Sequence, residues 1–188
     1  MEALGKGAEW KGLGEKNVYL IGFMGSGKSL VGRKLAERMG REFIDMDEEI
    51  EKIEGMKIKE IFARKGEEYF RMQEEKLLEE LGRLKGRVIS TGGGVVMRER
   101  NWKILKKGVT VYLEISEEEA IKRLKDVKDR PILERGKREE IIKTLLPIRR
   151  PYYEKADIKV KAEGKKVEEI VEEILSKLAN FKNEGNYN

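Results

Sequence analysis

One stretch limits the possible folds of this 188-residue chain more than any other. Residues 22–29 read Gly-Phe-Met-Gly-Ser-Gly-Lys-Ser and match the pattern G-x-x-x-x-G-K-[ST] at every fixed position. An apolar run, Val18–Ile21, comes before it, and apolar residues at helical spacing, Val31, Leu35 and Met39, come after it. The stretch is therefore predicted to connect a buried parallel strand to a helix, which is the context that a phosphate-binding loop requires.

The residue types in this loop are those that phosphate binding needs. Glycines let backbone N–H groups turn inward around phosphate oxygens, where a side chain would fill the space. The partial positive charge at the start of the following helix adds to the attraction. Lys28 can then reach the β- and γ-phosphates, and the Ser29 hydroxyl can ligate Mg²⁺. A glycine-rich turn that binds nothing is the alternative, and the register of strand, loop and helix argues against it.

Composition narrows the chemistry available to such a site. Hydrophobic residues make up 39% of the chain and charged residues 41%, which fits one globular domain rich in charged helices. Cysteine and histidine are absent, so carboxylates, lysines and arginines must do the chemistry at neutral pH. With no disulfides, no secretory signal pattern and no apolar run of membrane-spanning length, we expect a cytoplasmic location. The net charge of +5 could indicate nucleic-acid binding, but basic residues alternate with Glu along most helices, which favours a solvated surface.

The rest of the chain predicts an α/β fold. Short apolar runs alternate with segments of helical periodicity, which implies a parallel sheet covered on both faces, with ligands at the carboxyl ends of its strands. Further strands are expected at residues 42–44, 87–90, 109–115 and 157–161. Helices are expected at about 48–84 with breaks near Gly55 and Gly66, after a capping Ser116, from 138 to a corner at 149–151, and over 167–178.

Three segments lack hydrophobic periodicity. Residues 1–16 are expected to form a flexible leader, and residues 181–188 a frayed tail. Residues 125–138 are polar and charged, contain Arg130-Pro131, and lie between helices, so we interpret them as a mobile lid. With no internal repeat in the sequence, residues 17–180 are expected to form a single domain.

Two carboxylates follow the second predicted strand. Asp45 and Asp47 lie two residues apart, so their side chains can point to the same side of the crevice. One of them can help to hold Mg²⁺, which prefers oxygen ligands, and the other can accept a hydroxyl proton from a phosphoryl acceptor. An acidic surface turn would be the better interpretation in isolation, and the nearby phosphate loop favours the functional one.

Glycines and arginines extend this predicted site. Gly92-Gly93-Gly94 directly follows a strand and would let the backbone come close to a second ligand. Four arginines are candidates for binding an anionic acceptor, because guanidinium groups hold carboxylates and phosphates at two points. They are Arg71, Arg123, Arg130 and Arg149, of which Arg130 lies in the lid and Arg149 precedes a proline.

Over about residues 17–178 the chain resembles the bacterial-type shikimate kinases. Apart from the phosphate loop no single motif is specific, whereas the set in this order and spacing is. The motifs are Gly22-x-x-Gly25-x-Gly27-Lys28-Ser29, Asp45-x-Asp47, Phe70-Arg71, Gly92-Gly93-Gly94, Arg130-Pro131-Ile132-Leu133 and Arg149-x-Pro151-x-Tyr153. Ile132 replaces the more usual Leu, and the residues before Asn17 have no counterpart in the shortest family members.

The resemblance implies a three-layer P-loop kinase fold with a five-stranded parallel sheet in the order 2-3-1-4-5. It also implies an acceptor-binding segment at about residues 46–75 and a lid at about 124–138 that closes over ATP. The implied activity is ATP-dependent phosphorylation of the 3-hydroxyl of shikimate, with Mg²⁺, in the biosynthesis of chorismate and aromatic amino acids. We expect a monomer that binds neither nucleic acid nor membranes.

A role for each matching residue follows from the same resemblance. Asp47 would bind the reacting hydroxyl of shikimate as the candidate base, while Lys28 and Arg130 would neutralise charge on the transferring phosphoryl group. Docking of Arg130 on lid closure is expected to limit hydrolysis of ATP by water. Other acceptor contacts are expected from Arg71, Gly92, Gly93, Gly94 and Arg149, and Mg²⁺ contacts from Ser29 and Asp45. Nucleotide contacts are expected from Gly25, Ser26, Gly27, Lys28, Ser29, Leu30, Arg130 and Arg123, the last against adenine.

Rival functions share parts of this pattern. A gluconate or nucleoside-monophosphate kinase would also have a phosphate loop and lid arginines, and the glycine run with Asp47, Arg71 and Arg149 favours a carboxylated polyol instead. A non-catalytic ATP-binding protein would be expected to lose the acceptor-site carboxylate or the lid arginine, and both are present.

Overall fold

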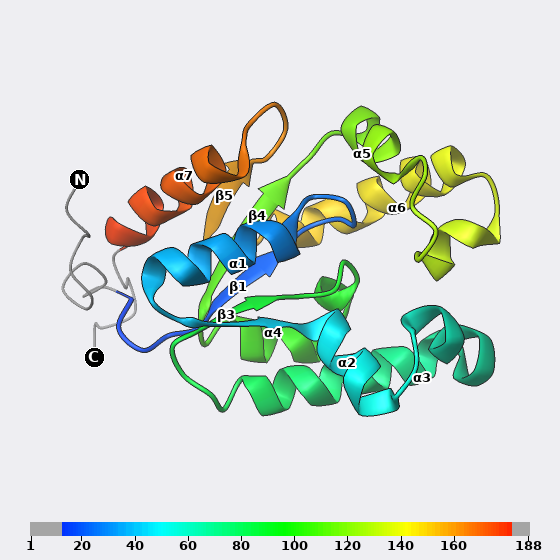
Figure 1. Ribbon diagram of the computed structural model, residues 1–188, viewed down its shortest axis with the longest axis horizontal. Coiled ribbons are helices and arrows are strands. Elements are labelled where there is room, and N and C mark those ends of the chain that lie inside the picture. The colour runs from blue at the N-terminus through cyan, green and yellow to red at the C-terminus, as the bar shows by residue number, and fades with distance from the viewer. Residues whose placement is uncertain (1–12, 182–188) are drawn as a thin grey trace.

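A five-stranded parallel sheet forms the centre of the computed structural model, which describes residues 13–181 (Figure 1). The strand order is β2-β3-β1-β4-β5, as the sequence resemblance implies. The strands are β1 (Val18–Ile21), β2 (Glu42–Asp45), β3 (Arg87–Ser90), β4 (Val109–Glu114) and β5 (Ile158–Lys161).

The burial of each strand follows from its place in the sheet. All four residues of β1 are buried, because β3 and β4 pair with its two edges and helices cover both of its faces. On the edge strand β5, Ile158 and Val160 are buried while Lys159 and Lys161 are exposed. The strands in the middle of the sheet therefore read as continuous apolar runs, and β5 reads as an alternating pattern.

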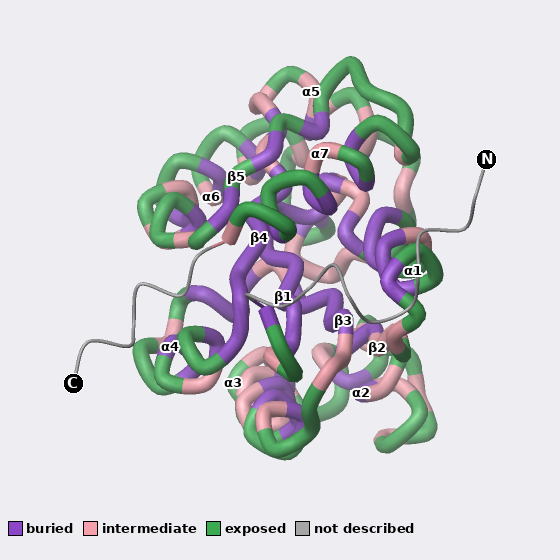
Figure 2. The backbone as a smooth tube through the Cα atoms, turned by 90° about the vertical axis from the view of Figure 1, so that its left-hand side faces the viewer, coloured by how far each residue is buried: buried purple, intermediate pink, exposed green. Residues whose placement is uncertain are grey.

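Helices on both faces complete a three-layer arrangement. Helices α1 and α7 pack together on one face of the sheet, and α4 and α6 lie on the other (Figure 2). The helices are α1 (Lys28–Met39), α2 (Met46–Glu54), α3 (Ile58–Leu81), α4 (Glu99–Leu105), α5 (Glu117–Leu124), α6 (Arg138–Tyr153) and α7 (Val167–Ala179). There are also two short 3₁₀ helices. The first, η1 (Val95–Met97), follows the glycine run, and the second, η2 (Pro131–Arg135), lies in the lid segment.

The breaks predicted in the long helical segment are confirmed. Gly55 ends α2 in the left-handed conformation, with φ of 65°. Gly66 interrupts α3 with φ of 83° and ψ of 166°, a combination open to glycine and strained for other residues. The segment from α2 through α3 is thus divided at both glycines, and the second break lies directly before Glu67.

The predicted corner at Arg149–Pro151 is wrong, because α6 continues to Tyr153 with Pro147 and Pro151 inside it. A proline ring fixes φ at a helical value, and its cost comes from the missing N–H and from contact with the preceding turn. Those costs are met here by packing, since Leu146, Arg149 and Tyr153 are buried along one side of the helix. A helix that bears two prolines is not what the sequence pattern predicts.

The predicted leader and tail need a correction at their inner ends. Residues 1–12 and 182–188 lie outside the described residues. Residues 13–16 are not a flexible leader, because Leu13 is buried in the core and both terminal nitrogens of Arg41 donate to backbone oxygens of this turn at 2.7 Å. Phe181 likewise packs against the core rather than fraying. A single apolar residue among polar ones gives no periodic signal. The packing of Leu13 and of Phe181 against the core could therefore not be predicted from the sequence pattern.

Within residues 13–181, no helix has the length and apolar character needed to cross a membrane.

Candidate active site

Backbone geometry at the β1–α1 junction forms the predicted phosphate loop. Gly22, Gly25 and Gly27 have φ values of 150°, 80° and 90°, which other residues rarely adopt. A Cβ on Gly22 would lie 2.8 Å from the backbone oxygen of Leu113. The loop ends where α1 begins, at Lys28, so the positive end of that helix faces the loop.

Side chains in the loop fit a nucleotide phosphate. Lys28 donates from Nζ to the carbonyl oxygens of Gly22 and Phe23, at 2.8 and 3.0 Å. Burial, and after it the charge of Arg130, lower the pKa of Lys28 to about 7. The buried Ser26 Oγ has no hydrogen-bond partner among the described residues. An anionic phosphate in the loop would give Ser26 a partner and favour the charged form of Lys28.

Ser29 and Asp45 bring two oxygens together beside the loop. Ser29 Oγ donates to Asp45 Oδ2, while Asp45 Oδ1 accepts from the backbone N–H groups of Asp47 and Glu48 and caps α2. In the described part of the chain, no three or more His, Cys, Asp or Glu residues gather where they could hold a metal ion. A hydroxyl and a carboxylate suit Mg²⁺, which takes few protein ligands and fills its shell with water and phosphate oxygens.

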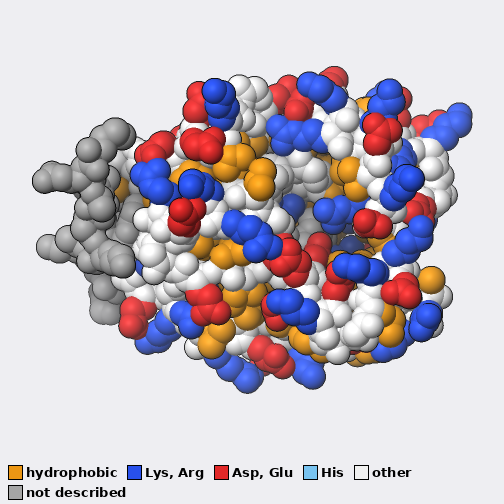
Figure 3. All heavy atoms as spheres, viewed as in Figure 1, with side chains coloured by type: hydrophobic (Ala, Val, Ile, Leu, Met, Phe, Trp, Pro, Cys, Tyr) orange, Lys and Arg blue, Asp and Glu red, His pale blue; other side chains and the backbone are white. Residues whose placement is uncertain are grey.

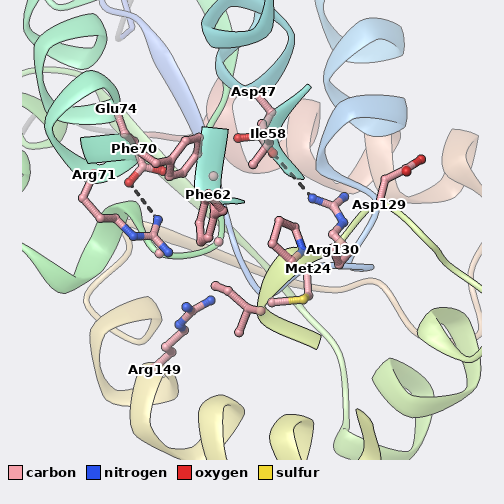
Figure 4. A pocket seen from close by; sticks show the side chains of 15 residues that line it. Met24, Asp47, Ile58, Phe62, Phe70, Arg71, Glu74, Asp129, Arg130 and Arg149 are labelled. Atoms are coloured by element: carbon pink, nitrogen blue, oxygen red, sulfur yellow. Dashed lines mark hydrogen bonds and ion pairs between the residues drawn. The ribbon is translucent and has the colours of Figure 1, made fainter. Parts of the chain in front are cut away.

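A pocket opens beside the loop, at the carboxyl ends of the strands (Figure 4). Arg71 and Arg149 point into it from one side, and Asp47 and Arg130 lie on the other. The pocket is lined by Met24, Asp47, Ile58, Phe62, Phe70, Arg71, Glu74, Gly92, Gly93, Gly94, Asp129, Arg130, Pro131, Ile132 and Arg149.

Asp47 faces the pocket from the first turn of α2. Its Oδ2 lies 3.5 Å from Nη1 of Arg130, which reaches across from the lid segment. Burial raises the pKa of Asp47, while Arg130 opposes the rise. A carboxylate with a raised pKa at the end of a strand is suited to accept a proton from an alcohol.

Two arginines form the opposite wall. Arg71, on α3, is held by Glu74 Oε2 at 3.0 Å and by Glu67 Oε1 at 3.4 Å. Arg149, on α6, is 5% exposed, although it lies in a pocket open to solvent. Two guanidinium groups directed at one small space make a binding site for a planar anion such as a carboxylate.

The glycine run closes the floor of the pocket. A Cβ on Gly94 would lie 2.5 Å from Nη1 of Arg71, and a Cβ on Gly93 would lie 3.3 Å from Nη1 of Arg149. The hydroxyl of Tyr153 donates to the carbonyl oxygen of Gly93 at 2.5 Å, and the ring of Tyr153 stacks on Tyr112. The glycines therefore make room for the two guanidinium groups, and Tyr153 fixes the backbone between them.

Arg123 and Leu30 lie outside the pocket. Arg123 donates from Nη1 to the backbone oxygen of Gly25 at 3.1 Å and from Nε to Glu119 at 2.6 Å, which places it beside the phosphate loop. Leu30 is exposed in the first turn of α1. Both are on the nucleotide side of the predicted site and touch none of the acceptor-side groups.

Glu74 is a site residue that the sequence analysis missed. It is 1% exposed, its Oε1 has no hydrogen-bond partner within residues 13–181, and burial raises its pKa. The signal was present in the sequence, because Glu74 lies four residues from both Phe70 and Leu78 on the apolar face of α3. A lone carboxylate on a buried helix face indicates a buried partner or a functional site.

The surface around the site is charged without being uniformly basic. Acidic and basic side chains alternate over the face shown in Figure 3. This distribution agrees with a solvated surface, as the sequence pattern indicates, rather than with a continuous basic track.

Known proteins are similar to this chain in sequence and in fold. Residues 24–179 match the family model described as shikimate kinase. A shikimate kinase from Thermodesulfovibrio yellowstonii is 47% identical over 169 residues, which cover 89% of this chain and 98% of that relative. One from Aquifex aeolicus is 48% identical over 162 residues, covering 86% of this chain and 95% of that relative.

Solved structures agree with these sequence matches. The structure of a shikimate kinase from Acinetobacter baumannii in complex with shikimate superposes with a TM-score of 0.87 and 36% identity, covering 92% of this chain and 98% of that one. A gluconokinase from Sinorhizobium meliloti superposes with a TM-score of 0.59 at 23% identity over 88% of this chain and 93% of that one, a similarity of fold alone.

Proposed function

The chain belongs to the shikimate kinase family, and on this premise we propose how its own residues transfer a phosphoryl group from ATP to the 3-hydroxyl of shikimate. The chain is a phosphotransferase with the fold of P-loop kinases. Its products are ADP and shikimate 3-phosphate, and its pathway is the biosynthesis of chorismate and aromatic amino acids.

One observation above all supports this proposal at the level of residues. Asp47, Arg71 and Arg149 come from three separate helices and line a single pocket beside the phosphate loop. The two arginines can hold a carboxylate while Asp47, on the other side, faces a hydroxyl of the same molecule. An acceptor with a carboxylate at one end and hydroxyls at the other matches this arrangement, with the two arginines on one side of the pocket and the carboxylate of Asp47 on the other.

Asp47 orients the reacting hydroxyl and accepts its proton. Its raised pKa makes the carboxylate a stronger base, and an efficient catalytic base has a pKa near the working pH. Phosphoryl transfer depends mainly on positioning and on stabilising charge, so a site without His or Cys is sufficient.

The phosphate loop and its neighbours hold the nucleotide. Residues 25–30 surround the phosphates, with Lys28 on the β- and γ-phosphates, and Arg123 lies against adenine. Mg²⁺ fits beside Ser29 and Asp45, where it would offset the charge of the phosphates. The unpartnered hydroxyl of Ser26 and the lowered pKa of Lys28 support this assignment, because an anion would give the hydroxyl a hydrogen-bond partner and the lysine an opposite charge.

Arg130 links the lid to the reacting centre. Its guanidinium group faces Asp47 at 3.5 Å, and its charge also reaches Lys28. In this position it neutralises charge that develops on the transferring phosphoryl group and keeps water from the γ-phosphate. Lid closure over a bound acceptor therefore favours transfer over hydrolysis.

We also propose that the protein works as a cytoplasmic monomer whose partners are shikimate and ATP, and neither nucleic acid nor membranes. The alternation of acidic and basic residues over the face shown in Figure 3 supports the exclusion of nucleic acid.

A coupled ADP-release assay tests the proposal. Purified protein with ATP and Mg²⁺ is mixed with shikimate, gluconate or a nucleoside monophosphate. We expect shikimate alone to drive ADP release at a rate far above the hydrolysis background. Equal rates with gluconate or a nucleotide, or no response to shikimate, would contradict the assignment of the acceptor.

A further inference from the structure

A chain of alternating charges runs from the lid to the acceptor side of the pocket. Arg135, in η2 of the lid segment, lies 2.8 Å from Glu67 Oε2 through its Nη2. The other oxygen of Glu67, Oε1, lies 3.4 Å from Nη2 of Arg71, and Nη1 of Arg71 lies 3.0 Å from Glu74 Oε2. One carboxylate thus connects an arginine of the lid to an arginine that lines the pocket.

The two contacts of Glu67 are unequal. The Arg135 contact is shorter by 0.6 Å than the Arg71 contact, so Glu67 is held mainly by the lid. Burial acts to raise the pKa of Glu67, but the contacts with Arg135 and Arg71 outweigh burial and lower it. Glu67 is therefore an ionised carboxylate, and its negative charge is directed at a guanidinium group that an anionic acceptor also needs.

We infer that Arg135 is a positioning residue of the lid that engages Glu67 and thereby releases Arg71 to bind the carboxylate of the acceptor. Without a cation from the lid, Glu67 competes with the acceptor for Arg71. With Arg135 in place, the negative charge of Glu67 is neutralised. The positive potential that Arg71 presents to the acceptor is then less offset by Glu67. The inference rests on the proposed function, because it requires an acceptor that carries a carboxylate.

The local backbone allows this exchange. Gly66, directly before Glu67, interrupts α3 with φ of 83°, so residues 58–65 are separated from the part of the helix that bears Glu67 and Arg71. Arg135 also lies over the ring of Phe62, 6.0 Å from its centroid, and Phe62 contacts Phe70. The lid arginine thus rests on both halves of α3 at the point where the helix is broken.

A second ion pair joins the lid to α3 without touching this chain of charges. Lys59 Nζ lies 3.0 Å from Oε1 of Glu134, and Glu134 is the residue directly before Arg135 in the lid segment. Neither residue contacts Glu67 or Arg71 in the structure. Breaking this pair weakens the attachment of the lid to the same helix, so Glu134→Gln is a matched control for loss of the Arg135 contact.

Steady-state kinetics with shikimate and ATP as the varied substrates test the inference. For Arg135→Gln we expect the KM for shikimate to rise about fivefold, with kcat and the KM for ATP changed by less than about twofold. For Glu134→Gln the KM for shikimate should stay within about twofold of the wild-type value. Equal increases in the two variants would overturn the inference, because the lid would then act only as a tether.

A double-mutant comparison isolates the role of Glu67. In a Glu67→Gln background the only carboxylate left beside Arg71, among the residues that the structure describes, is Glu74, which Arg135 does not contact, so adding Arg135→Gln should leave the KM for shikimate unchanged. If Arg135→Gln raises this KM by the same factor with and without Glu67, the inference is wrong. Titration of shikimate into each variant by calorimetry should give the same order of affinities.

The same experiments separate this inference from the proposed function. If the wild-type protein releases ADP in response to shikimate but Arg135→Gln leaves the KM for shikimate unchanged, the inference alone fails. If the wild-type protein does not respond to shikimate, the proposed function fails, and the inference falls with it.

Discussion

The two halves of the proposed active site are built in different ways. The phosphate side consists of one continuous segment, β1, the loop and α1, in which buried main chain and a buried lysine form the binding surface. The acceptor side is assembled from α2, α3, the glycine run, the lid and α6, and its charged groups hold one another through ion pairs. The first half is fixed by backbone conformation, and the second by side chains that can exchange partners.

This difference separates two tasks of a kinase. The triphosphate is common to many reactions and can be held by a rigid backbone loop. The acceptor must be recognised, aligned and enclosed, which requires groups that change partners when it binds. Substitutions on the two sides should therefore fail in different ways, and four substitutions and one pH dependence can test that expectation.

Asp47→Asn should have the largest effect and should affect only the chemical step. We expect kcat to fall about 10³-fold, because the base is lost, while nucleotide affinity changes by less than about threefold. Glu48→Gln, which alters the exposed neighbour that pairs with Arg33, is the control and should keep near-normal turnover. Near-normal turnover in Asp47→Asn would exclude Asp47 as base or orienting group.

Arg130→Ala should lower the rate of transfer by about 10²-fold, because a guanidinium group near the transferring phosphoryl is lost. The ratio of ATP hydrolysis to acceptor phosphorylation should rise at the same time, since water gains access to the nucleotide. Both products are measured in one assay, and Lys128→Ala, an exposed lid residue, is the control. A rate within a few-fold of wild type would refute this role of Arg130.

Gly94→Ala tests the acceptor side alone. The added methyl group would collide with the Arg71 guanidinium, the end of a flexible side chain, so folding should tolerate it. We expect the KM for shikimate to rise about tenfold with the KM for ATP unchanged, because one of two carboxylate contacts is displaced.

The matched change on the phosphate side is Gly22→Ala. There φ is 150° and the obstacle is the Leu113 backbone, so we expect nucleotide binding and thermal stability to suffer together. If Gly94→Ala weakens ATP and shikimate binding equally, the two halves of the site are not independent.

The pH dependence of nucleotide binding should show the smallest effect near neutral pH. Burial lowers the pKa of Lys28 to about 7 in the ligand-free protein, whereas the nucleotide phosphates favour its charged form. Nucleotide binding above pH 7 should therefore take up a proton, and affinity should fall by up to about tenfold per pH unit. Calorimetry at pH 8 in buffers of different ionisation enthalpy measures this uptake, and it should vanish in Lys28→Arg. No uptake in the wild-type protein would contradict the lowered pKa.

The sequence predicts the two halves unequally well. The phosphate loop could be placed from residues 18–39 alone, because strand, loop and helix are neighbours in the chain and each has a local pattern. The sheet order and the role of each acceptor residue came from the resemblance to a known family, since no local pattern states which distant segments meet. Asp47, the glycine run and the arginines were already candidates from their residue types and positions. Confirmation of that sheet order supports the resemblance as a guide to the fold.

What the sequence did not predict are contacts that depend on tertiary packing. Glu74 was overlooked because an acidic residue on a long charged helix usually faces solvent. The continuation of α6 past Pro151 was missed because proline normally ends a helix and only burial of neighbouring residues compensates for it. The contact between Arg135 and Glu67 joins residues 68 positions apart, and its two partners are ordinary surface residues in the sequence.

The hydrogen bond from Tyr153 to Gly93 has a mechanical consequence. Arg149 and Tyr153 lie on adjacent turns of α6, so this hydrogen bond joins the helix that carries Arg149 directly to the glycine run. Arg71, by contrast, lies on a helix interrupted at Gly66. We therefore expect a carboxylate between the two arginines to meet a braced wall at Arg149 and an adjustable one at Arg71, so that Arg71 makes most of the fit to an acceptor of slightly different size.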